Sequence, residues 1–433
     1  MPHPLHVLVI GYVWPEPRSS AAGGHMMQLL EAFLAEGWCI TFASPAKVGE
    51  HKADLAALGI VETPIQLNDA SFDTFVGHLQ PDVVLFDRFM MEEQFGWRVE
   101  KHCPNALRVL ETSDLQSLRD ARQALLKERL KHEPDNQDFS GLFATGQAEL
   151  FDHMAERDIT QREIAAIYRC DLSLMISPAE IELLTQRFAV PRALLHWCPL
   201  MVDEQRPAAP AFAERAHFLS IGNFRHAPNW DAVLWMKNTL WPLIRQRLPQ
   251  AQLHVYGAYT PPKATALHNP AQGFHVKGWA EDALHVMAAS RVALAPLRFG
   301  AGIKGKLLDA MLCGTPSVTT PVGAEGMCAR GDWPGTVQNS ANALADEAVA
   351  LYADERHWAQ AQARGYELLG EQYAFACHAP ALTHLIQSLR ANLAAHRRAN
   401  FTGSMLRHHQ HKSTQYFAQW IEAKNRPSHS LDP

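Results

Sequence analysis

RFGAGIKGKLLDAMLCGTPSVTTPVGAEG, residues 298–326, is the most informative stretch of this chain. At its start three glycines alternate with two lysines: Gly300, Gly302, Gly305, Lys304 and Lys306. Apolar residues then recur with the spacing of one helical face: Leu307, Leu308, Met311 and Leu312. Gly314 ends this helix, and the apolar run around Val318 predicts a following strand. A glycine-rich turn that enters a helix presents free backbone N–H groups and the positive end of the helix dipole.

Two full positive charges beside such a turn predict a site for a phosphate or diphosphate. The alternative is a purely structural turn, because glycines between a strand and a helix can be required for steric reasons alone. Nothing structural demands paired cations there, so anion binding is the favoured interpretation. The stretch is neither the G-x-G-x-x-G fingerprint nor the P-loop, because Lys306 is followed by Leu307. A P-loop kinase or ATPase is therefore not expected.

Composition limits the class of protein. A chain of 433 residues can form two or three domains, each with its own core. Hydrophobic residues make up 47% and charged residues 19%, which is typical of a soluble globular protein. The net charge of −6 argues against broad nucleic-acid binding but leaves room for a local basic pocket.

The cysteines and the N-terminus indicate the compartment. Seven cysteines are scattered without a C-x-x-C pair, which favours reduced thiols over a disulfide framework or a zinc site, and no metal or other cofactor is expected. The apolar stretch at residues 5–10 is too short for a signal sequence or a membrane span and predicts a first strand. We expect a cytoplasmic protein, with docking on a membrane surface left open.

Short apolar runs alternate with helical patterns through the first half of the chain. Five of them predict strands: residues 6–11, 39–44, 82–87, 106–111 and 172–177. Continuous apolar runs suit parallel strands that are covered on both faces. Residues 25–36 carry one apolar face and predict a helix. Residues 118–166 are expected to be largely helical, with a loop around 134–141.

A Pro- and Ala-rich stretch at residues 202–213 predicts a domain boundary, and a second strand series follows it. Its strands are expected at residues 217–222, 252–257, 273–278, 291–297, 317–320 and 335–339. Two doubly wound α/β domains are predicted to face one another, with the ligand beyond the carboxyl ends of the strands, in the cleft between them.

The end of the chain carries helical patterns without strands. Residues 355–397 predict helices, and residues 414–425 predict one more. RHHQHK, residues 407–412, suggests metal binding, but without carboxylates or cysteines at defined spacing a solvated basic turn is favoured. The expected domains are residues 1–205, residues 206–395 and a polar, partly helical tail at 396–433.

Several of these motifs, in this order, resemble the family 4 glycosyltransferases, which have the GT-B fold. Residues 218–257 resemble the first strand, loop, helix and second strand of their nucleotide-sugar domain. FHVKGW, residues 274–279, is similar to the strand and loop that face the base, and residues 296–320 are similar to the diphosphate loop and ribose-binding helix. Residues 11–38 and 162–184 resemble the opening and closing elements of the N-terminal domain.

The resemblance implies specific donor contacts. Asp309 takes the position of the acidic residue that binds the ribose, whereas Ala301 stands where the family has an earlier acidic residue and cannot replace it. Arg225, in GNFRHAPN, supplies one cation near the diphosphate, and Lys304 or Lys306 supplies another. The implied nucleotide-sugar contacts are Asn223, Gly278, Trp279, Gly300, Gly302, Ile303, Lys304, Asp309 and Glu325. For Glu325 a contact to the sugar and a bond to a loop amide remain alternatives.

The acceptor side is implied to lie in the N-terminal domain. Gly23 and Gly24 suit close approach of the backbone to a ligand. His25 could hydrogen-bond the substrate, and a capping role or a plain position on the helix is the alternative. Asp114, in ETSDLQSLR, could contact the acceptor or act as a base, and capping of the following helix is the alternative.

The family resemblance predicts a hexosyltransferase-like enzyme of polysaccharide biosynthesis. It would transfer a sugar from a nucleotide-diphosphate sugar to a glycan, lipid-linked or protein acceptor, with retention of configuration and no metal in the active site. Two alternatives remain: a nucleotide-sugar epimerase of the same fold, which needs no acceptor, and a degenerate nucleotide-sugar binder, which Ala301 keeps open.

Overall fold

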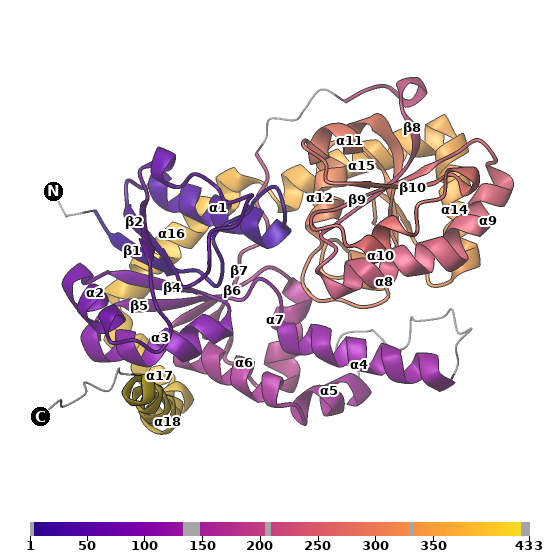
Figure 1. Ribbon diagram of the computed structural model, residues 1–433. Coiled ribbons are helices and arrows are strands. Elements are labelled where there is room, and N and C mark those ends of the chain that lie inside the picture. Colours follow the sequence, from indigo (N-terminus) through magenta and orange to yellow (C-terminus); the bar gives the residue numbers. More distant parts are fainter. Residues whose placement is uncertain (1–3, 133–147, 204–208, 330–331, 426–433) are drawn as a thin grey trace, which may run out of the picture.

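The computed structural model describes residues 4–132, 148–203, 209–329 and 332–425. It contains two parallel sheets in two lobes that lie side by side (Figure 1). The loop expected around residues 134–141 lies outside the described residues. The strand runs of both halves form strands as predicted, and the two-domain α/β architecture is confirmed.

The first sheet has seven parallel strands in the order β3-β2-β1-β4-β5-β6-β7. Its strands are β1 (His6–Ile10), β2 (Cys39–Ser44), β3 (Val61–Pro64), β4 (Val83–Asp87), β5 (Leu107–Glu111), β6 (Leu172–Met175) and β7 (Leu195–Trp197). Strands β3 and β7 were not predicted. They are the two edge strands of this sheet and are short; β3 also contains polar residues and lacks an apolar run.

Within the described residues before the second sheet, the chain adds these helices to the first lobe: α1 (Ala21–Ala35), α2 (Ser71–Leu79), α3 (Phe89–His102), α4 (Gln116–His132), α5 (Ala148–Ala155), α6 (Asp158–Arg169) and α7 (Pro178–Arg187). Alternate residues of β1 enter different cores, because successive side chains of a strand point to opposite faces. Val7 and Val9 pack with α1, whereas Leu8 and Ile10 pack with α2 and α3.

The second sheet has the order β10-β9-β8-β11-β12-β13. Its strands are β8 (Ala216–Ile221), β9 (Leu253–Tyr256), β10 (Phe274–Gly278), β11 (Ser290–Ala295), β12 (Ser317–Thr319) and β13 (Gly335–Val337). Its helices are α8 (Ala227–Trp235), α9 (Trp241–Arg247), α10 (Pro262–Thr265), α11 (Ala283–Ala289), α12 (Gly305–Leu312), α13 (Pro321–Ala324), α14 (Ala341–Ala353) and α15 (Glu355–Gln372). The order of strands reverses between β8 and β11, where such sheets bind ligands.

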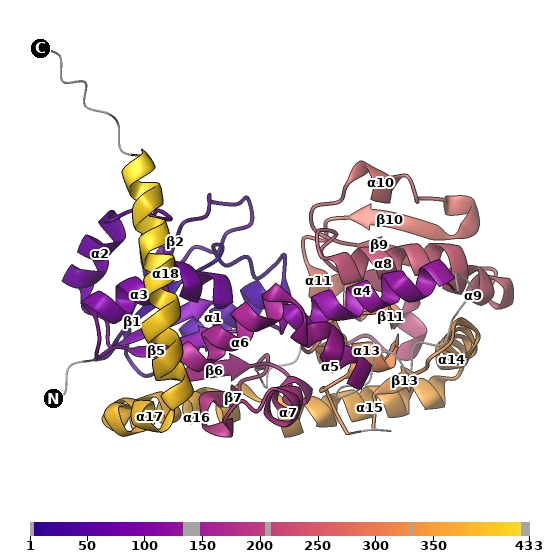
Figure 2. The same cartoon turned by 90° about the horizontal axis from the view of Figure 1, so that it is seen from below.

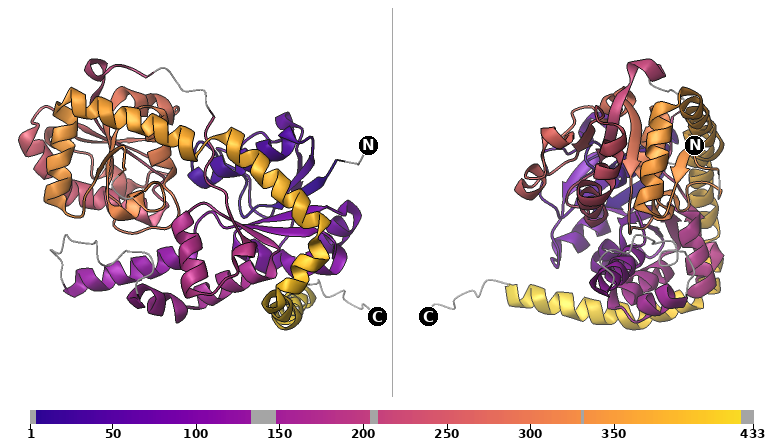
Figure 3. Two further views of the ribbon diagram at one scale, coloured as in Figure 1. Left: turned by 180° about the vertical axis from the view of Figure 1, so that it is seen from behind. Right: turned by 90° about the vertical axis from the view of Figure 1, so that its right-hand side faces the viewer.

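After α15 the chain returns to the first lobe, along the back of the molecule (Figure 3). Helix α16 (Phe375–Ala391) packs Leu382 and Ile386 into the core that contains Val7 and Val9. The domain limit expected at residue 395 is therefore wrong for α16, because this helix covers the first sheet. Sequence pattern alone identified the helix but not the sheet that it covers.

Two further helices, α17 (Leu393–Ala399) and α18 (Phe401–Asn425), follow on the first lobe. Helix α18 packs against α3 and α6 and extends past them (Figure 2). The helix predicted at residues 414–425 is confirmed and begins earlier than expected. RHHQHK is part of this helix rather than a turn.

Candidate functional site

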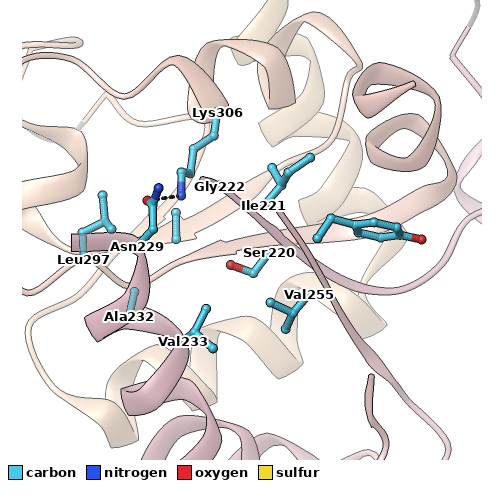
Figure 4. A pocket seen from close by; sticks show the side chains of 11 residues that line it. Ser220, Ile221, Gly222, Asn229, Ala232, Val233, Val255, Leu297 and Lys306 are labelled. Atoms are coloured by element: carbon cyan, nitrogen blue, oxygen red, sulfur yellow. Dashed lines mark hydrogen bonds between the residues drawn. The ribbon is translucent and has the colours of Figure 1, made fainter. Parts of the chain in front are cut away.

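The carboxyl ends of β8 and β11 bring the lysine-rich turn and the loop after β8 together. Lys306, on the first turn of α12, donates a 2.7 Å hydrogen bond from Nζ to Oδ1 of Asn229 on α8 (Figure 4). Gly222, at the end of β8, leaves room for this contact, since a Cβ there would lie 2.7 Å from Nζ. These groups line a small pocket together with Ser220, Ile221, Ala232, Val233, Val255, Tyr256, Ala295 and Leu297.

Lys304 is the N-cap residue of α12 and is buried. Its ammonium group donates to the carbonyl oxygens of Ala301, at 3.2 Å, and of Gly302. Burial lowers the pKa of Lys304 to about 8, against the opposite effect of Glu325. Burial and the neighbouring Lys304 likewise lower the pKa of Lys306 to about 8. In the described part of the chain neither lysine forms an ion pair with a carboxylate.

Asp309 lies on α12, three residues after Lys306. Its side chain is exposed at the surface of the site, and it has no hydrogen bond or ion pair within the described residues. The surrounding protein nevertheless raises the pKa of Asp309 to about 7 through desolvation.

The glycines of the turn are also required for packing between the lobes. Gly302 has a φ of 63°, and a Cβ there would lie 2.7 Å from Cδ1 of Ile176 and 3.0 Å from Cβ of Asp114. At Gly305 a Cβ would lie 2.6 Å from Cβ of Ala21, at the start of α1. Steric demands therefore account for two glycines of the turn, Gly302 and Gly305. They do not account for its two lysines.

Glu180, on α7, is a site residue that the sequence analysis missed. Its Oε1 accepts hydrogen bonds from the backbone N–H of Gly302, at 2.7 Å, and of Leu115, at 3.1 Å. Burial and the charge of Asp114 raise the pKa of Glu180 to about 8. In the sequence, Glu180 is visible only as an acidic residue at the start of the helix after β6. Nothing in the sequence connects it to the glycine turn.

Glu325, for which a sugar contact or a bond to a loop amide was considered from the sequence, pairs with an arginine of the first lobe. Nη1 and Nη2 of Arg122, on α4, donate to both carboxylate oxygens of Glu325 at 2.7 and 2.6 Å. Nη1 also donates to the carbonyl oxygen of Gly300 at 2.8 Å. The guanidinium of Arg122 is thus buried between the two lobes and fixes α4 to the glycine turn.

Asp114 lies against the turn and pairs with Arg119. Burial alone would raise the pKa of Asp114, but Arg119 brings it below its ordinary value. Asp114 does not cap the following helix, because Glu163 accepts the N–H groups of Gln116 and Ser117 at the start of α4. The capping alternative is therefore wrong for Asp114.

Arg225, Asn223 and Trp279 are placed where the lobes approach one another. The guanidinium of Arg225 lies 3.6 Å from the centre of the Tyr259 ring, and its backbone N–H donates to Oδ1 of Asn223. Trp279 follows Gly278 and stacks on His51 of the first lobe, with ring centres 4.0 Å apart. His51 thus covers one face of the ring of Trp279, the residue predicted to contact the base.

The acceptor-side predictions need correction for two residues. Helix α1 begins at Ala21, so Gly23 lies in its first turn, where a Cβ would lie 2.5 Å from the carbonyl oxygen of Glu16. The close approach at Gly23 is therefore to the chain itself. Gly24, by contrast, has open space where a Cβ would lie.

His25 faces the interior and is only 2% exposed. Its Nδ1 lies 3.3 Å from Oε1 of Glu111, and its Nε2 lies 3.9 Å from Sγ of Cys198. Burial opposes protonation, but Glu111 outweighs it and raises the pKa of His25 to about 10. A substrate hydrogen bond from His25 is not compatible with this burial.

Two further properties bear on function. Within the described residues, no group of three or more His, Cys, Asp or Glu side chains could hold a metal ion. A search of the same residues finds no helix with the length and apolar character needed to cross a membrane.

Residues 215–354 match the protein family described as glycosyl transferases group 1. This segment contains the lysine turn, Asp309 and Glu325. No curated protein sequence matches the chain significantly.

Solved structures show the same fold at low sequence identity. Sucrose-phosphate synthase from Thermosynechococcus elongatus is 18% identical with a TM-score of 0.64, and the match covers 89% of this chain and 99% of that one. HepE from Anabaena, solved with UDP and glucose, is 12% identical with a TM-score of 0.63, over 89% of this chain and 100% of HepE. The lipopolysaccharide outer core galactosyltransferase WaaB is 12% identical with a TM-score of 0.54, over 89% and 99% of the two chains. The GT-B fold expected from the sequence is confirmed by these likenesses.

Proposed function

We propose that this chain transfers a hexose from a nucleotide-diphosphate sugar to a carbohydrate, lipid-linked or protein acceptor. The match of residues 215–354 to the family described as glycosyl transferases group 1 supports this proposal. The donor occupies the carboxyl ends of β8 and β11, and the acceptor approaches from the first lobe. The expected stereochemistry is retention.

One observation carries the proposal: the two buried or half-buried lysines have no carboxylate partner within the described residues. The carboxylates of Glu325, Glu180 and Asp114 act on Lys304 without forming a direct ion pair, so burial of two neighbouring cations remains costly, and an anionic ligand lowers that cost. The diphosphate of a nucleotide sugar matches the two charges and the N-terminal dipole of α12. Arg225, from the loop after β8, supplies a third cation to the same group.

Asp309 supplies the ribose contact. An ionised carboxylate accepts hydrogen bonds from two neighbouring hydroxyl groups, and charge-assisted bonds of this kind are stronger than neutral ones. Desolvation raises the pKa of Asp309 to about 7. Donation from ribose hydroxyls stabilises its charged form. Ile303, Gly278 and Asn223 complete the proposed donor site.

The chemistry depends on the same cations. Cleavage of the sugar–phosphate bond leaves negative charge on the departing diphosphate, which Lys304 and Lys306 stabilise. Asp114 contacts the acceptor hydroxyl from the first lobe, and Gly24 leaves open space near the start of α1. The pKa of Asp114 is lowered, which makes it a weak base. The proton is therefore assigned to the departing diphosphate.

Calorimetric titration with UDP, GDP, ADP and dTDP tests the donor site. We expect one of them to bind the wild type, and Asp309→Ala or Lys306→Ala to weaken that binding by about tenfold or more, about 1.4 kcal/mol. Glu355→Ala, which removes an exposed carboxylate on α15, is the matched control and should bind like the wild type. A folded wild type that binds none of the four would contradict the proposal.

Turnover with sugars on the nucleotide that binds then separates the alternatives. Transfer to an acceptor with an unchanged anomeric configuration, read from the proton coupling of the product, supports the proposed reaction. Conversion of the sugar without any acceptor indicates the epimerase, and binding without turnover indicates the degenerate binder. Inversion at the anomeric carbon would overturn the retaining mechanism alone.

A further inference from the structure

Helix α18 exposes an unusual number of aromatic side chains. Four of the five exposed aromatic residues in the described part of the chain lie on it: Phe401, Tyr416, Phe417 and Trp420. The last three are 65%, 61% and 57% exposed. Phe417 and Trp420 are one turn apart and stack, with ring centres 6.0 Å apart. Clustered exposed aromatic residues mark an interaction surface.

The orientation of this face is fixed, because the opposite face of α18 is bound to the first lobe. At Gly403 a Cβ would lie 2.1 Å from the carbonyl oxygen of Tyr168, so the helix contacts α6 closely. Near its other end Glu422 pairs with the buried Arg98 of α3, and Ala418 is buried between these contacts. Because these contacts hold the opposite face of α18 against α3 and α6, the aromatic side chains point away from the protein.

The exposed face is also basic. Glu422 is the sole acidic residue in the sequence of α18, and it is neutralised by Arg98. Lys412 and Lys424 are exposed near the aromatic cluster, and the ammonium group of Lys424 lies 5.3 Å from the centre of the Trp420 ring. This local positive charge contrasts with the net charge of −6 of the whole chain.

We propose that the outer face of α18 binds the surface of an anionic lipid bilayer. Aromatic residues favour the boundary between head groups and acyl chains, and lysines beside them are attracted to anionic lipids. A helix of 25 residues is about 37 Å long and lies in the plane of the interface rather than across the bilayer. Helix α18 reaches beyond the body of the first lobe, so a flat surface can meet it (Figure 3).

A second copy of the chain fits this face less well. Pairing two α18 helices through their outer faces would bring the lysines of one helix towards those of the other. No acidic side chain on the face offsets that repulsion, because Glu422 is engaged with Arg98. The lipid surface supplies the missing negative charge.

Cosedimentation of the full chain with vesicles tests this proposal, which does not depend on the proposed transferase activity. Vesicles of equal parts phosphatidylglycerol and phosphatidylcholine should bind the wild type at least tenfold more strongly than phosphatidylcholine alone. Phe417→Ser/Trp420→Ser should lose at least tenfold of that binding, and Lys412→Glu/Lys424→Glu should lose the preference for anionic vesicles. Circular dichroism should show that both variants fold, since all four side chains are exposed.

Leu58→Ser/Val61→Ser is the matched control, because it removes two other exposed apolar side chains of the first lobe. It should bind vesicles like the wild type. Absence of wild-type binding, or equal loss in the control, would overturn the proposal. So would a concentration-dependent dimer that Phe417→Ser/Trp420→Ser abolishes in light scattering while vesicles do not bind, which would assign the face to a second copy.

Discussion

At the scale of single residues, Gly302 meets two demands at once. Its φ of 63° lies in the left-handed region, and the neighbouring lobe leaves no room for a side chain. Its backbone N–H is also used, since it donates to Glu180. Gly302, which the sequence predicts as part of an anion site, is therefore also a contact between the two lobes.

Gly302→Ala should lower the free energy of unfolding by about 1–2 kcal/mol from the backbone alone, with a further cost from the contact with Ile176. Gly24→Ala is the control with the opposite expected sign. Gly24 lies in α1 with open space around it, so alanine should stabilise the protein by about 0.5–1 kcal/mol. Urea unfolding midpoints measure both changes, and a shift in the same direction for the two variants would contradict the steric argument.

The sequence identified the charged residues of the turn because charge and spacing are local properties. Lys304, Lys306 and Asp309 lie within six positions of one another, on one turn and the helix that follows it. The environment of His25 was not predictable in this way. Its partner Cys198 is 173 positions away, and only the folded chain brings the two together.

At the scale of elements, the N-terminus of α4 is capped by the carboxylate of a residue on another helix. Both oxygens of Glu163, on α6, accept backbone N–H groups of Gln116 and Ser117, at 2.9 and 3.0 Å. Burial raises the pKa of Glu163 to about 7. The first turn of α4 thus depends on a residue that follows the helix in the chain.

Glu163→Ala should cost about 1–3 kcal/mol of unfolding free energy, because it leaves buried N–H donors without an acceptor. Glu156→Ala, at an exposed position just before α6, should change stability by less than about 0.5 kcal/mol. Thermal or urea denaturation measures the difference. Equal stability of the two variants would show that α4 does not need this cap.

The interior strands of both sheets and the edge strands of the second sheet could be predicted from sequence, whereas the edge strands of the first sheet and the helix partners could not. Strand β4 is buried along its whole length and reads as a continuous apolar run. Strand β3, which contains Glu62 and ends at Pro64, is half exposed and lacks that signal. Which sheet α16 covers depends on the path of the whole chain, since an apolar helical face fits either lobe.

At the scale of the whole molecule, the lobes are joined by contacts that come from both. Arg122 binds Glu325 and Gly300, and Glu180 binds Gly302. The hydroxyl group of Tyr259 donates to Glu16 at 2.7 Å on another part of the boundary. Among these groups, the side chains of Arg122 and Glu180 are both fully buried.

Arg122→Met should destabilise the protein by about 3–5 kcal/mol, because it leaves the charge of Glu325 without its buried partner. It should also increase the radius of gyration in small-angle X-ray scattering as the lobes separate. Arg157→Met, which removes a more exposed pair with Asp120, should cost less than about 1 kcal/mol and leave the radius unchanged. An unchanged radius in Arg122→Met would show that the other contacts suffice to hold the lobes.

The return of α16 to the first lobe has a topological consequence. The chain leaves the first lobe near Val202 and re-enters it at Phe375, and these two crossings are bound to each other: the N–H of Val202 donates to Tyr373, and the N–H of Phe375 donates to Val202. The second lobe is therefore an insertion in the first lobe, which is continuous in space although its sequence is interrupted. Both crossings therefore lie at one point of the boundary, where hydrogen bonds tie the outgoing and the returning segment of the chain together.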